Sequence, residues 1–377
     1  MKIGIDARMM GSASGGIGRY VFELVKKLLV HDAINNYKIF FRPKAADSES
    51  LDFFGKFSNV ELIPSNARHY SLSEQTSFLK QLNNVACDLV HFPNFNVPLY
   101  YQRPFVVTIH DMVHHKIGGA KKTHFLHFAA YKKVMESAAK NSRAIITVSE
   151  SSKEDIVKYL NVVPRKVAVI YEGVSVNSQV SSEQVESVKK KFYLNKPYFL
   201  FVGVLERKKN LVSLTRAFDI FVKNYGFEMD MVLVGKQDLH YPEIKYKALD
   251  IKNRDRLVFT GAVSDGDLAA LYRGAYCYVS ASLHEGFGLP GVEAMSFGLP
   301  LIVSNTNVFN EIYDNAAVYF DPLNLEDIAA KMNLLVSDRQ FYESLAQKSF
   351  IRSKNFDWNN TASQTLKIYK ECLGENI

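Results

Sequence analysis

The sequence has few cysteines and no long hydrophobic run. Its three cysteines, Cys87, Cys277 and Cys372, are far apart, and none belongs to a C-x-x-C pair. This spacing argues against a disulfide framework and against a zinc site. The longest apolar stretches, such as Tyr198–Leu205, are far shorter than the roughly 20 residues that cross a bilayer. We therefore expect a soluble or peripheral protein in a reducing compartment.

Other signals are also missing. Asp6 and Arg8 interrupt the first residues, so no secretory signal is expected, and no repeat of about 20 to 50 residues is visible. A net charge of +7 is compatible with phosphate-bearing or membrane-surface partners but selects none of them. The expected location is the cytoplasm, with peripheral contact at the inner face of the cell membrane as an open alternative.

The length and the pattern of the chain predict two α/β domains. A chain of 377 residues exceeds what one hydrophobic core usually serves. Short apolar runs alternate with amphipathic stretches, as in parallel sheets built from β-α-β units. The series of strands restarts at Tyr198 after a Ser-rich stretch, which places a boundary near residue 175. The expected strands are Lys2–Asp6, Tyr37–Phe41, Leu89–Phe92, Phe105–Ile109, Ala144–Val148 and Val167–Ile170, then Tyr198–Gly203, Met231–Gly235, Leu257–Thr260, Cys277–Ser280 and Leu301–Ser304.

The segment Cys277–Ser304 is the most informative one. It predicts a strand, a glycine-rich turn, a helix opened by Pro290, and a further strand. Ligands of open α/β sheets bind at such strand ends, where glycines permit close approach and a helix start offers N–H groups to a phosphate. Glu285 and Glu293 place two acceptor-only carboxylates there, which suits sugar hydroxyls. In the alternative interpretation neither carboxylate binds a sugar: Glu285 is a solvated loop residue, and Glu293 complements the helix dipole.

Three other motifs follow predicted strands. Gly15–Tyr20 is a glycine-rich turn that opens a helix over Arg19–Leu29, and it indicates a phosphate cradle, a flexible connection or an imperfect dinucleotide fingerprint. His110 ends a strand, where it is either a proton or hydrogen-bond partner or a structural residue. Lys208 and Lys209 put positive charge at the start of a helix over Leu211–Asn224, where a diphosphate could rest, unless the turn is simply exposed.

These motifs resemble the retaining, metal-independent glycosyltransferases of GT-B fold, family 4 (glycosyltransferase group 1). The resemblance rests on E-G-F-G-L-P-x-x-E-A-M from Glu285, on G-x-L-x-x-x-K-N from Gly203, on G-G-I-G-R-Y and on the H-D step at His110. It implies two Rossmann-like β/α/β domains that face each other across a cleft. The expected parts are residues 1–175 on the acceptor side, residues 176–355 on the nucleotide-sugar side, and residues 356–377 as a helix that returns to the first domain.

The resemblance also implies roles for individual residues. Glu285 would hold the hydroxyls of the donor sugar, Glu293 the ribose, Lys209 the leaving diphosphate, and His110 would face the reaction centre. Many relatives carry an arginine where this sequence has Val204, so Lys208 is the expected second phosphate ligand. His110 and Glu285 are the expected catalytic residues. The expected donor-binding residues are Gly16, Gly18, Gly203, Lys208, Lys209, Glu285, Gly286, Phe287, Gly288, Leu289 and Glu293.

No metal or other cofactor is expected. The triplet Asp265–Asp267 matches the sequence of a metal-binding D-x-D motif but falls on a predicted helix start. Lysines and helix N-termini would neutralise the charge of the diphosphate instead of a metal ion.

The opening G-I-D-A-R, with G-G-I-G-R-Y and H-D-M, looks like the corresponding motifs of bacterial polysaccharide mannosyltransferases. The expected donor is therefore GDP-mannose, with a UDP-sugar as the alternative, and the acceptor is a glycan or a polyprenyl-diphosphate-linked glycan of surface polysaccharide or O-antigen synthesis. No nucleic-acid partner is expected.

Three alternatives stay open. The basic stretch His114–Lys140 is either a membrane-surface helix or an ordinary surface helix. An NAD-dependent oxidoreductase would use the Gly15–Gly18 turn, but the strand Tyr37–Phe41 is followed by Arg42 and not by the acidic residue that such enzymes use. A non-catalytic sugar-binding scaffold is the third, because a fold alone does not establish an activity.

Overall fold

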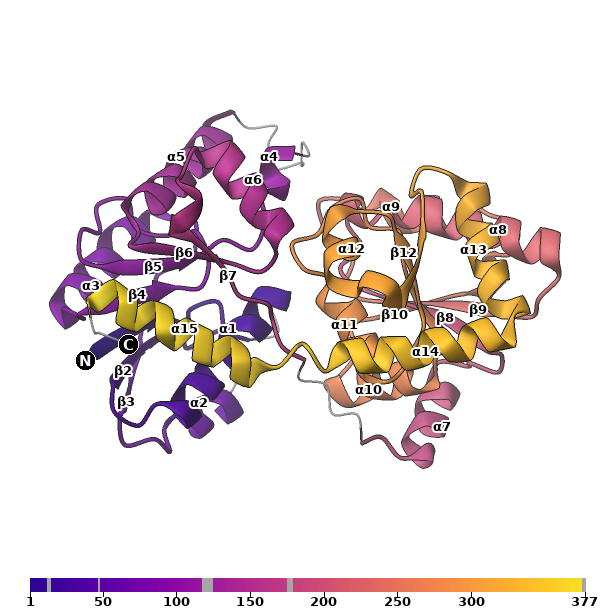
Figure 1. The fold of residues 1–377 in the computed structure, drawn as a ribbon, viewed down its shortest axis with the longest axis horizontal. Helices are drawn as coiled ribbons and strands as arrows, with labels where there is room; N and C mark the ends of the chain where they lie inside the picture. The colour runs from indigo at the N-terminus through magenta and orange to yellow at the C-terminus, as the bar shows by residue number, and fades with distance from the viewer. Residues whose placement is uncertain (12–14, 47, 117–124, 175–178, 375–377) are drawn as a thin grey trace. The chain divides into compact units, whose positions relative to one another are not determined.

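The computed structural model describes residues 1–11, 15–46, 48–116, 125–174 and 179–374. The chain forms two α/β units (Figure 1). Unit 1 consists of Met1–Gly173 and Asp357–Ile377, and unit 2 of Val174–Phe356. The chain thus passes between the units close to the expected residues 175 and 355, and residues 175–178 themselves lie outside the described part.

Unit 1 contains a sheet of seven parallel strands in the order β3-β2-β1-β4-β5-β6-β7. The order reverses between β1 and β4, which is the topological switch point where open α/β sheets bind ligands. Most of these strands are buried, as continuous apolar runs in a parallel sheet should be. Their bounds are β1 (Lys2–Asp6), β2 (Asn36–Phe41), β3 (Val60–Pro64), β4 (Leu89–Phe92), β5 (Phe105–Thr108), β6 (Ala144–Thr147) and β7 (Val167–Val169).

Helices flank this sheet. The apolar face of α1, with Val21, Leu24 and Leu28, is buried as its helical spacing predicts. The last helix, α15, lies against α1 (Figure 1). The helical elements are α1 (Gly15–His31), α2 (Ser48–Phe54), η2 (Glu74–Phe78), α3 (Leu79–Val85), α4 (Val113–Lys116), α5 (Phe125–Asn141), α6 (Glu150–Leu160), η4 (Pro164–Lys166) and α15 (Trp358–Leu373).

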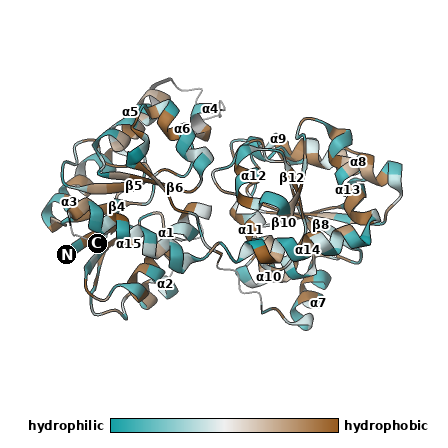
Figure 2. Ribbon diagram, viewed as in Figure 1, coloured by the Kyte–Doolittle hydropathy of each residue, from teal (hydrophilic) through white to brown (hydrophobic). Residues whose placement is uncertain are grey.

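Unit 2 contains a sheet of six parallel strands in the order β10-β9-β8-β11-β12-β13. Its switch point lies between β8 and β11. The strands are apolar and the outer faces of the helices are polar, as Figure 2 shows for both units. The bounds of the strands are β8 (Tyr198–Val202), β9 (Asp230–Val234), β10 (Leu257–Gly261), β11 (Cys277–Ser280), β12 (Leu301–Ser304) and β13 (Ala317–Phe320).

The helices of unit 2 follow its strands, and α8 and α13 pack against each other. Ser181 opens α7 with a capping box, in which its hydroxyl and the side chain of Gln184 satisfy two backbone N–H groups. The helical elements are α7 (Ser182–Lys191), η5 (Arg207–Lys209), α8 (Leu211–Tyr225), α9 (Glu243–Ala248), η6 (Arg254–Arg256), α10 (Asp265–Gly274), α11 (Leu289–Ser296), α12 (Asn307–Tyr313), η7 (Asp314–Ala316), α13 (Leu325–Ser337) and α14 (Arg339–Ser353).

Two strands were missing from the sequence-based prediction. Both β3 and β13 are edge strands. The strand β3 is interrupted by the charged Glu61 and ends at Pro64, which lacks the N–H that a central strand would need. Edge position alone does not explain the omission, because the edge strands β7 and β10 were predicted.

Gly173 and Trp358, both in unit 1, flank the two places where the chain leaves that unit. A Cβ atom on Gly173 would lie 2.2 Å from the backbone nitrogen of Trp358 and 2.5 Å from its Cγ. The hydroxyl of Thr361 donates a hydrogen bond to the carbonyl of Tyr171 at 2.7 Å. The returning helix is therefore attached to the outgoing strand within unit 1, and only glycine fits at position 173.

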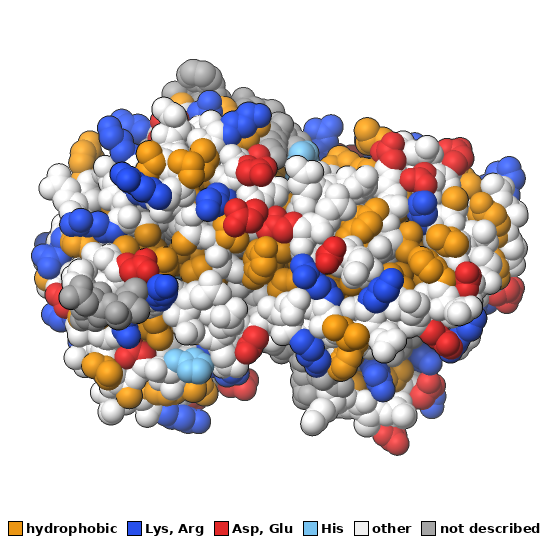
Figure 3. Space-filling view, viewed as in Figure 1, with side chains coloured by type: hydrophobic (Ala, Val, Ile, Leu, Met, Phe, Trp, Pro, Cys, Tyr) orange, Lys and Arg blue, Asp and Glu red, His pale blue; other side chains and the backbone are white. Residues whose placement is uncertain are grey.

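The described part of the basic stretch looks like an ordinary surface helix. In α5, Met135, Ala138 and Ala139 are buried, whereas its lysines Lys132, Lys133 and Lys140 are exposed. Lys121 and Lys122 lie outside the described residues. Acidic and basic side chains both occur on each unit in the face of Figure 3. Within the described ranges, no helix is both long enough and apolar enough to span a membrane.

Candidate active site

The expected donor site lies at the switch point of unit 2. The loop after β8 and the loop after β11 leave adjacent strands at the same edge of the sheet, where ligands of such folds bind. A backbone hydrogen bond of 2.8 Å from Leu283 N to Lys208 O joins the two loops. The sequence-predicted residues of these loops, separated by about 75 positions, are thereby brought together.

Lys209 and Glu285 form an ion pair at this edge. The Nζ atom of Lys209 donates a hydrogen bond to Oε1 of Glu285, and each side chain is only 12% exposed. Burial alone would raise the pKa of Glu285, but the charges of Lys209 and Lys208 hold it below its ordinary value of 4.5. The carboxylate is therefore charged at neutral pH, and it neutralises the lysine that the sequence assigns to the diphosphate.

Lys208 is oriented differently from its neighbour. Its Nζ atom lies 3.5 Å from Oε1 of Glu206, and both side chains are partly exposed. Lys208 therefore presents a more accessible positive charge than Lys209. This placement is compatible with the role of a second phosphate ligand, which stays a prediction.

Gly203 lies directly beside the side chain of Lys209. A Cβ atom on Gly203 would lie 3.4 Å from Cε and 3.7 Å from Nζ of Lys209, and the backbone has a φ of +157°. On its other side, Gly235 at φ +144° packs so closely that a Cβ there would be 2.0 Å from the carbonyl oxygen of Gly203. Gly235 is thus required by the close approach of the loop after β9 to Gly203, and Gly203 is favoured by its positive φ.

Glu293 is buried in the first turns of α11. It is only 3% exposed, and one of its carboxylate oxygens accepts a hydrogen bond of 2.8 Å from the hydroxyl of Tyr272. The same hydroxyl lies 3.1 Å from the carbonyl oxygen of Pro290. Glu293 is therefore not the simple solvated complement of a helix dipole, and a ribose would have to approach a carboxylate that Tyr272 already fixes.

The glycines of the turn have a reason that the sequence did not reveal. A Cβ on Gly288 or on Gly291 would lie 2.3 Å from the hydroxyl oxygen of Tyr313, and that hydroxyl donates a hydrogen bond of 2.7 Å to the carbonyl of Gly288. The space beside these two glycines is filled by Tyr313, so our interpretation that they admit a ligand is wrong for that side of the turn. Gly286 and Phe287 are buried in the same turn, and Leu289 begins α11.

Asp265–Asp267 is a helix start, as predicted. Asp267 accepts a hydrogen bond from Nζ of Lys191 at 2.7 Å, and its backbone N–H donates to Ser264. Within the described residues, no group of three or more histidine, cysteine, aspartate or glutamate side chains is arranged to hold a metal ion.

In unit 1, His110 follows β5 and is held on both ring nitrogens. Nε2 lies 3.0 Å from the carbonyl oxygen of Pro93, and Nδ1 lies 3.4 Å from Oε1 of Glu172. The ring of Tyr20 packs edge-on at 4.7 Å. Burial lowers the pKa of His110, but the bond to Glu172, its charge and the Pro93 carbonyl outweigh this effect and raise the pKa above 6.5.

His91 is less suited to a reaction centre than His110. His91 is fully buried and bridges the hydroxyls of Tyr369, at 2.6 Å, and Thr108, at 2.8 Å. Burial, with a smaller contribution from the charge of His110, lowers the pKa of His91 to about 3, so it stays neutral.

The glycines of the first motif, Gly16 and Gly18, lie in the first turn of α1, and a Cβ on Gly16 would meet open space.

Glu172 was not identified from the sequence, where it appeared only as the start of a polar stretch. We expect Glu172→Gln to lower the pKa of His110, because the substitution removes the carboxylate that favours the imidazolium. The folded-state pKa of His110 lies above 6.5, so its protonation stabilises the fold below that pH and the contribution is lost as pH rises through the folded-state pKa.

This expectation is checked by NMR titration of the His110 ring, assigned by its loss in His110→Asn. Glu154→Gln, an exposed carboxylate on α6, is the control and should leave the pKa unchanged. An unchanged His110 pKa in Glu172→Gln would show that the ion pair does not set its charge. In denaturant titrations, Glu172→Gln should also lose less stability than the wild type as the pH is raised.

A second group that the sequence did not identify supports the start of unit 1. Arg8 is buried and donates to Asp6 and to Glu74 at 2.7 Å and 2.8 Å, with its guanidinium 3.5 Å above the ring of Phe78. Asn96 donates to the same oxygen of Glu74 at 2.8 Å. Because a buried charge is tolerated only with such partners, this network fixes the loops at the switch point of unit 1.

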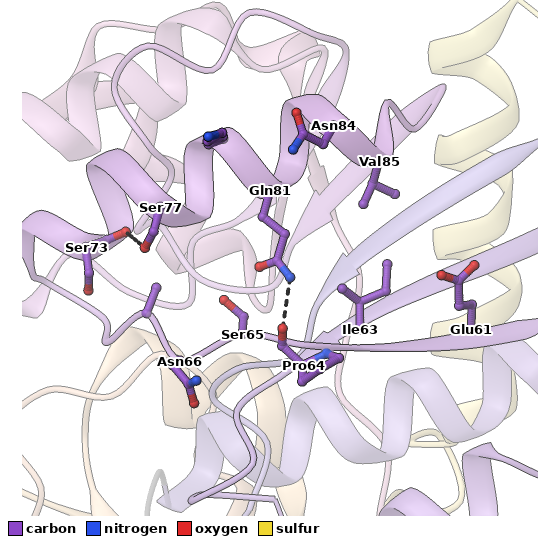
Figure 4. Close-up of a pocket in the computed structure, with 12 residues that line it drawn as sticks. Glu61, Ile63, Pro64, Ser65, Asn66, Ser73, Ser77, Gln81, Asn84 and Val85 are labelled. Carbon is purple, nitrogen blue, oxygen red and sulfur yellow. Dashed lines mark hydrogen bonds between the residues drawn. The ribbon is translucent and has the colours of Figure 1, made fainter.

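A groove lies at the outer edge of the same sheet, between β3 and the helices η2 and α3 (Figure 4). Its volume is about 570 Å³. Gln81 crosses it to donate a hydrogen bond of 2.9 Å to the carbonyl of Pro64. The groove contains none of the site residues that the sequence predicts.

The fold and the edge residues together define a class of protein, the glycosyltransferases built from two parallel-sheet α/β units. A profile described as Glycosyltransferase Family 4 matches residues 14–178, and one described as Glycosyl transferases group 1 matches residues 182–351. The chain belongs to this family of glycosyltransferases, and the resemblance inferred from its motifs is confirmed.

Individual relatives agree with this assignment. The chain is 26% identical to O-antigen chain mannosyltransferase B of Escherichia coli, over 94% of this chain and 96% of that protein. It is also 26% identical to the serotype-specific mannosyltransferase WbdA of Escherichia coli, over 97% of this chain but 46% of that protein.

Solved structures confirm the fold, which is the GT-B arrangement expected from the motifs. A glycosyltransferase from Rickettsia africae aligns with a TM-score of 0.74 at 19% identity, covering 100% of this chain and 99% of that one. Anabaena HepE, solved with UDP and glucose, aligns with a TM-score of 0.76 at 17% identity, covering 98% and 100%. The oxidoreductase and scaffold alternatives find no support in these relatives.

Proposed function

We propose that this glycosyltransferase moves mannose from GDP-mannose to a glycan acceptor, without a metal ion and with retention of the anomeric configuration. The observation that carries the proposal is the meeting of Lys208, Lys209 and Glu285 at the switch point of unit 2. Both relatives described above are named mannosyltransferases, which supports mannose as the sugar. A UDP-sugar is the alternative donor.

The chemistry requires neutralisation of the negative charge that develops on the departing diphosphate. Lys209 and Lys208 are fixed cations at the beginning of α8, so they can do this without a metal ion. Their pre-arrangement costs no reorganisation when the bond to the sugar breaks. A diphosphate that binds here competes with Glu285 for Lys209, which would release the carboxylate to accept hydrogen bonds from the sugar hydroxyls.

The remaining residues have supporting roles in this proposal. Glu293 accepts from a ribose hydroxyl while Tyr272 holds its other side, and His110 faces the donor sugar. The carboxylate of Glu172 raises the pKa of His110 and so favours its imidazolium form. No covalent nucleophile is proposed, so the acceptor hydroxyl attacks on the face from which the phosphate leaves.

The proposed acceptor is a lipid-linked glycan of surface polysaccharide or O-antigen synthesis. The relative of full length is named an O-antigen chain mannosyltransferase, which supports this pathway. Peripheral contact with the cytoplasmic membrane face would give access to such an acceptor, and the exposed lysines of α5 would contribute to it.

The donor is tested by thermal unfolding with GDP, UDP, ADP, CMP, GDP-mannose, UDP-glucose, UDP-N-acetylglucosamine and NAD(H), each with EDTA. A ligand at 100 times its dissociation constant adds about 2.7 kcal/mol, which shifts the midpoint by several degrees. We expect GDP and GDP-mannose to give the largest shifts, and Glu293→Ala to lose them. A shift of the unfolding midpoint with UDP-sugars alone would identify a UDP-sugar as the donor. A shift with NAD(H) alone would contradict the proposal.

A further inference from the structure

The segment Ser65–Ser73 connects β3 to η2 and is fixed at both ends. Gln81 donates to the carbonyl of Pro64 at 2.9 Å, and the hydroxyl of Ser77 donates to the carbonyl of Ser73 at 2.8 Å (Figure 4). In its middle, the carbonyl of Ala67 accepts from the guanidinium of Arg8 at 3.4 Å. The buried ion network at the start of unit 1 therefore determines the course of this segment.

Tyr70, within this segment, has a left-handed backbone with a φ of +57°. This conformation is disfavoured for a bulky residue, and such strain is found where the surrounding structure imposes it. Of the six non-glycine residues with positive φ in the described ranges, the other five lie at or just after the end of a helix. Those five are Ala86, Asn161, Tyr193, Asn210 and Asp314. Tyr70 lies in a connecting segment, and its backbone N–H donates to Oε2 of Glu74 at 3.1 Å.

The side chain of Tyr70 is anchored at its tip although the residue is 63% exposed. Its hydroxyl accepts a hydrogen bond of 3.1 Å from Nδ2 of Asn94. Its ring lies 5.7 Å from that of Phe95, which in turn packs edge-on against Tyr131 at 5.2 Å. We call Tyr70, Phe95 and Tyr131 the aromatic ledge. The strained backbone and the anchored tip hold an aromatic ring at the surface, where burial does not require it.

The aromatic ledge and His110 are attached to the same loop. Pro93, whose carbonyl accepts from Nε2 of His110, directly precedes Asn94, which holds the Tyr70 hydroxyl. This loop follows β4, so it lies at the switch point of unit 1, between β1 and β4. The anchors of the exposed ring and of the candidate reaction-centre histidine are thus successive residues.

An exposed aromatic ring beside amide groups matches the two surfaces of a sugar. The C–H face of a pyranose is apolar and packs on a ring, whereas its hydroxyls both donate and accept, as amides do. We propose that Tyr70 is the residue on which a sugar ring of the acceptor stacks, beside Phe95 and Asn94. This inference rests on the proposed function, because it assigns the acceptor of that reaction, and it names a glycoside as the chemical class.

The experiment measures binding of sugars to the full chain by saturation-transfer difference NMR. The ligands are the methyl α- and β-glycosides of mannose, glucose, galactose and N-acetylglucosamine. At least one of them should bind the wild type, and Tyr70→Gly should weaken that signal about tenfold. Glycine adopts a φ of +57° without strain, so the variant keeps its fold. Tyr70→Phe, which retains the ring, should still bind.

Tyr193→Ala is the matched control, because Tyr193 has the same φ of +57°, is 85% exposed and belongs to unit 2. It should bind the glycosides as the wild type does. The inference is overturned if Tyr70→Gly binds them as well as the wild type, or if the wild type binds none. The thermal shift given by GDP should be the same in all variants. Glycoside binding without any nucleotide-induced shift would contradict the proposed donor and leave the stacking role supported.

Discussion

Lys209→Met is expected to reduce sugar transfer by at least about 100-fold, because it removes a fixed cation from the departing diphosphate. The same substitution leaves the carboxylate of Glu285 buried without its partner. Breaking a buried ion pair from one side costs about 3–5 kcal/mol of the free energy of unfolding. Initial rates of GDP release and urea denaturation measure the two effects separately.

The double variant Lys209→Met with Glu285→Leu distinguishes the effect on the rate of transfer from the effect on the free energy of unfolding. Replacing both partners by apolar residues of similar volume removes the uncompensated charge, so most of the lost unfolding free energy should return. Transfer should remain as low as in Lys209→Met, because the cation is still missing. Lys196→Ala, at a partly exposed ion pair with Glu228 in the same unit, is the control and should change both quantities little. Normal transfer by Lys209→Met would contradict the role assigned to this lysine.

Gly291→Ala is expected to destabilise unit 2, although alanine is the better helix former. Propensity alone would stabilise α11 by up to about 1 kcal/mol. Against this, the new Cβ would lie 2.3 Å from the hydroxyl oxygen and 2.5 Å from Cζ of Tyr313, which is buried and bonded to Gly288. Overpacking of this kind costs about 1–3 kcal/mol, so the clash should prevail.

A double-mutant cycle with Tyr313→Leu tests the cause of that loss. Leucine lacks the atoms that the new Cβ would meet, so Gly291→Ala should cost nothing in the Tyr313→Leu background, a coupling of about 2 kcal/mol. Urea denaturation without any ligand measures it. If Gly291→Ala left the stability of the ligand-free protein unchanged, the glycine would have to serve the ligand, as the sequence suggested.

The sequence identified the architecture because buried parallel strands carry an unmistakable apolar signal. All eleven strands expected from the sequence are present, and the restart at Tyr198 corresponds to the first strand of unit 2. The edge strand β3 was missed because its open edge tolerates Glu61 and Pro64, which interrupt the apolar run. The strand β13 is a short apolar run, Ala317–Phe320, that the prediction overlooked. The prediction of a helix start at Asp265 was correct, because Ser264 as N-cap followed by an acidic first turn is typical of helix starts.

The site could be predicted only where residue type and position in a motif were enough. Lys209 and Glu285 were chosen as ligands, and nothing in one sequence shows that they pair with each other across about 75 residues. Tyr313 and Glu172 were missed for the same reason, since each acts through a contact with a distant segment. We interpreted Gly288 as making room for a ligand. A glycine in a turn indicates that another group comes close to the backbone, but it does not show which group that is.

The most direct test of the account is the rate at which GDP-mannose is turned over by the wild-type protein in EDTA. We predict release of GDP and of α-configured mannose, or its transfer to an added glycoside, at a rate that EDTA does not reduce and that exceeds turnover of UDP-glucose. Turnover that requires a divalent metal ion, yields a β-configured product, or is absent with GDP-mannose but present with UDP-glucose would contradict the proposed donor and mechanism.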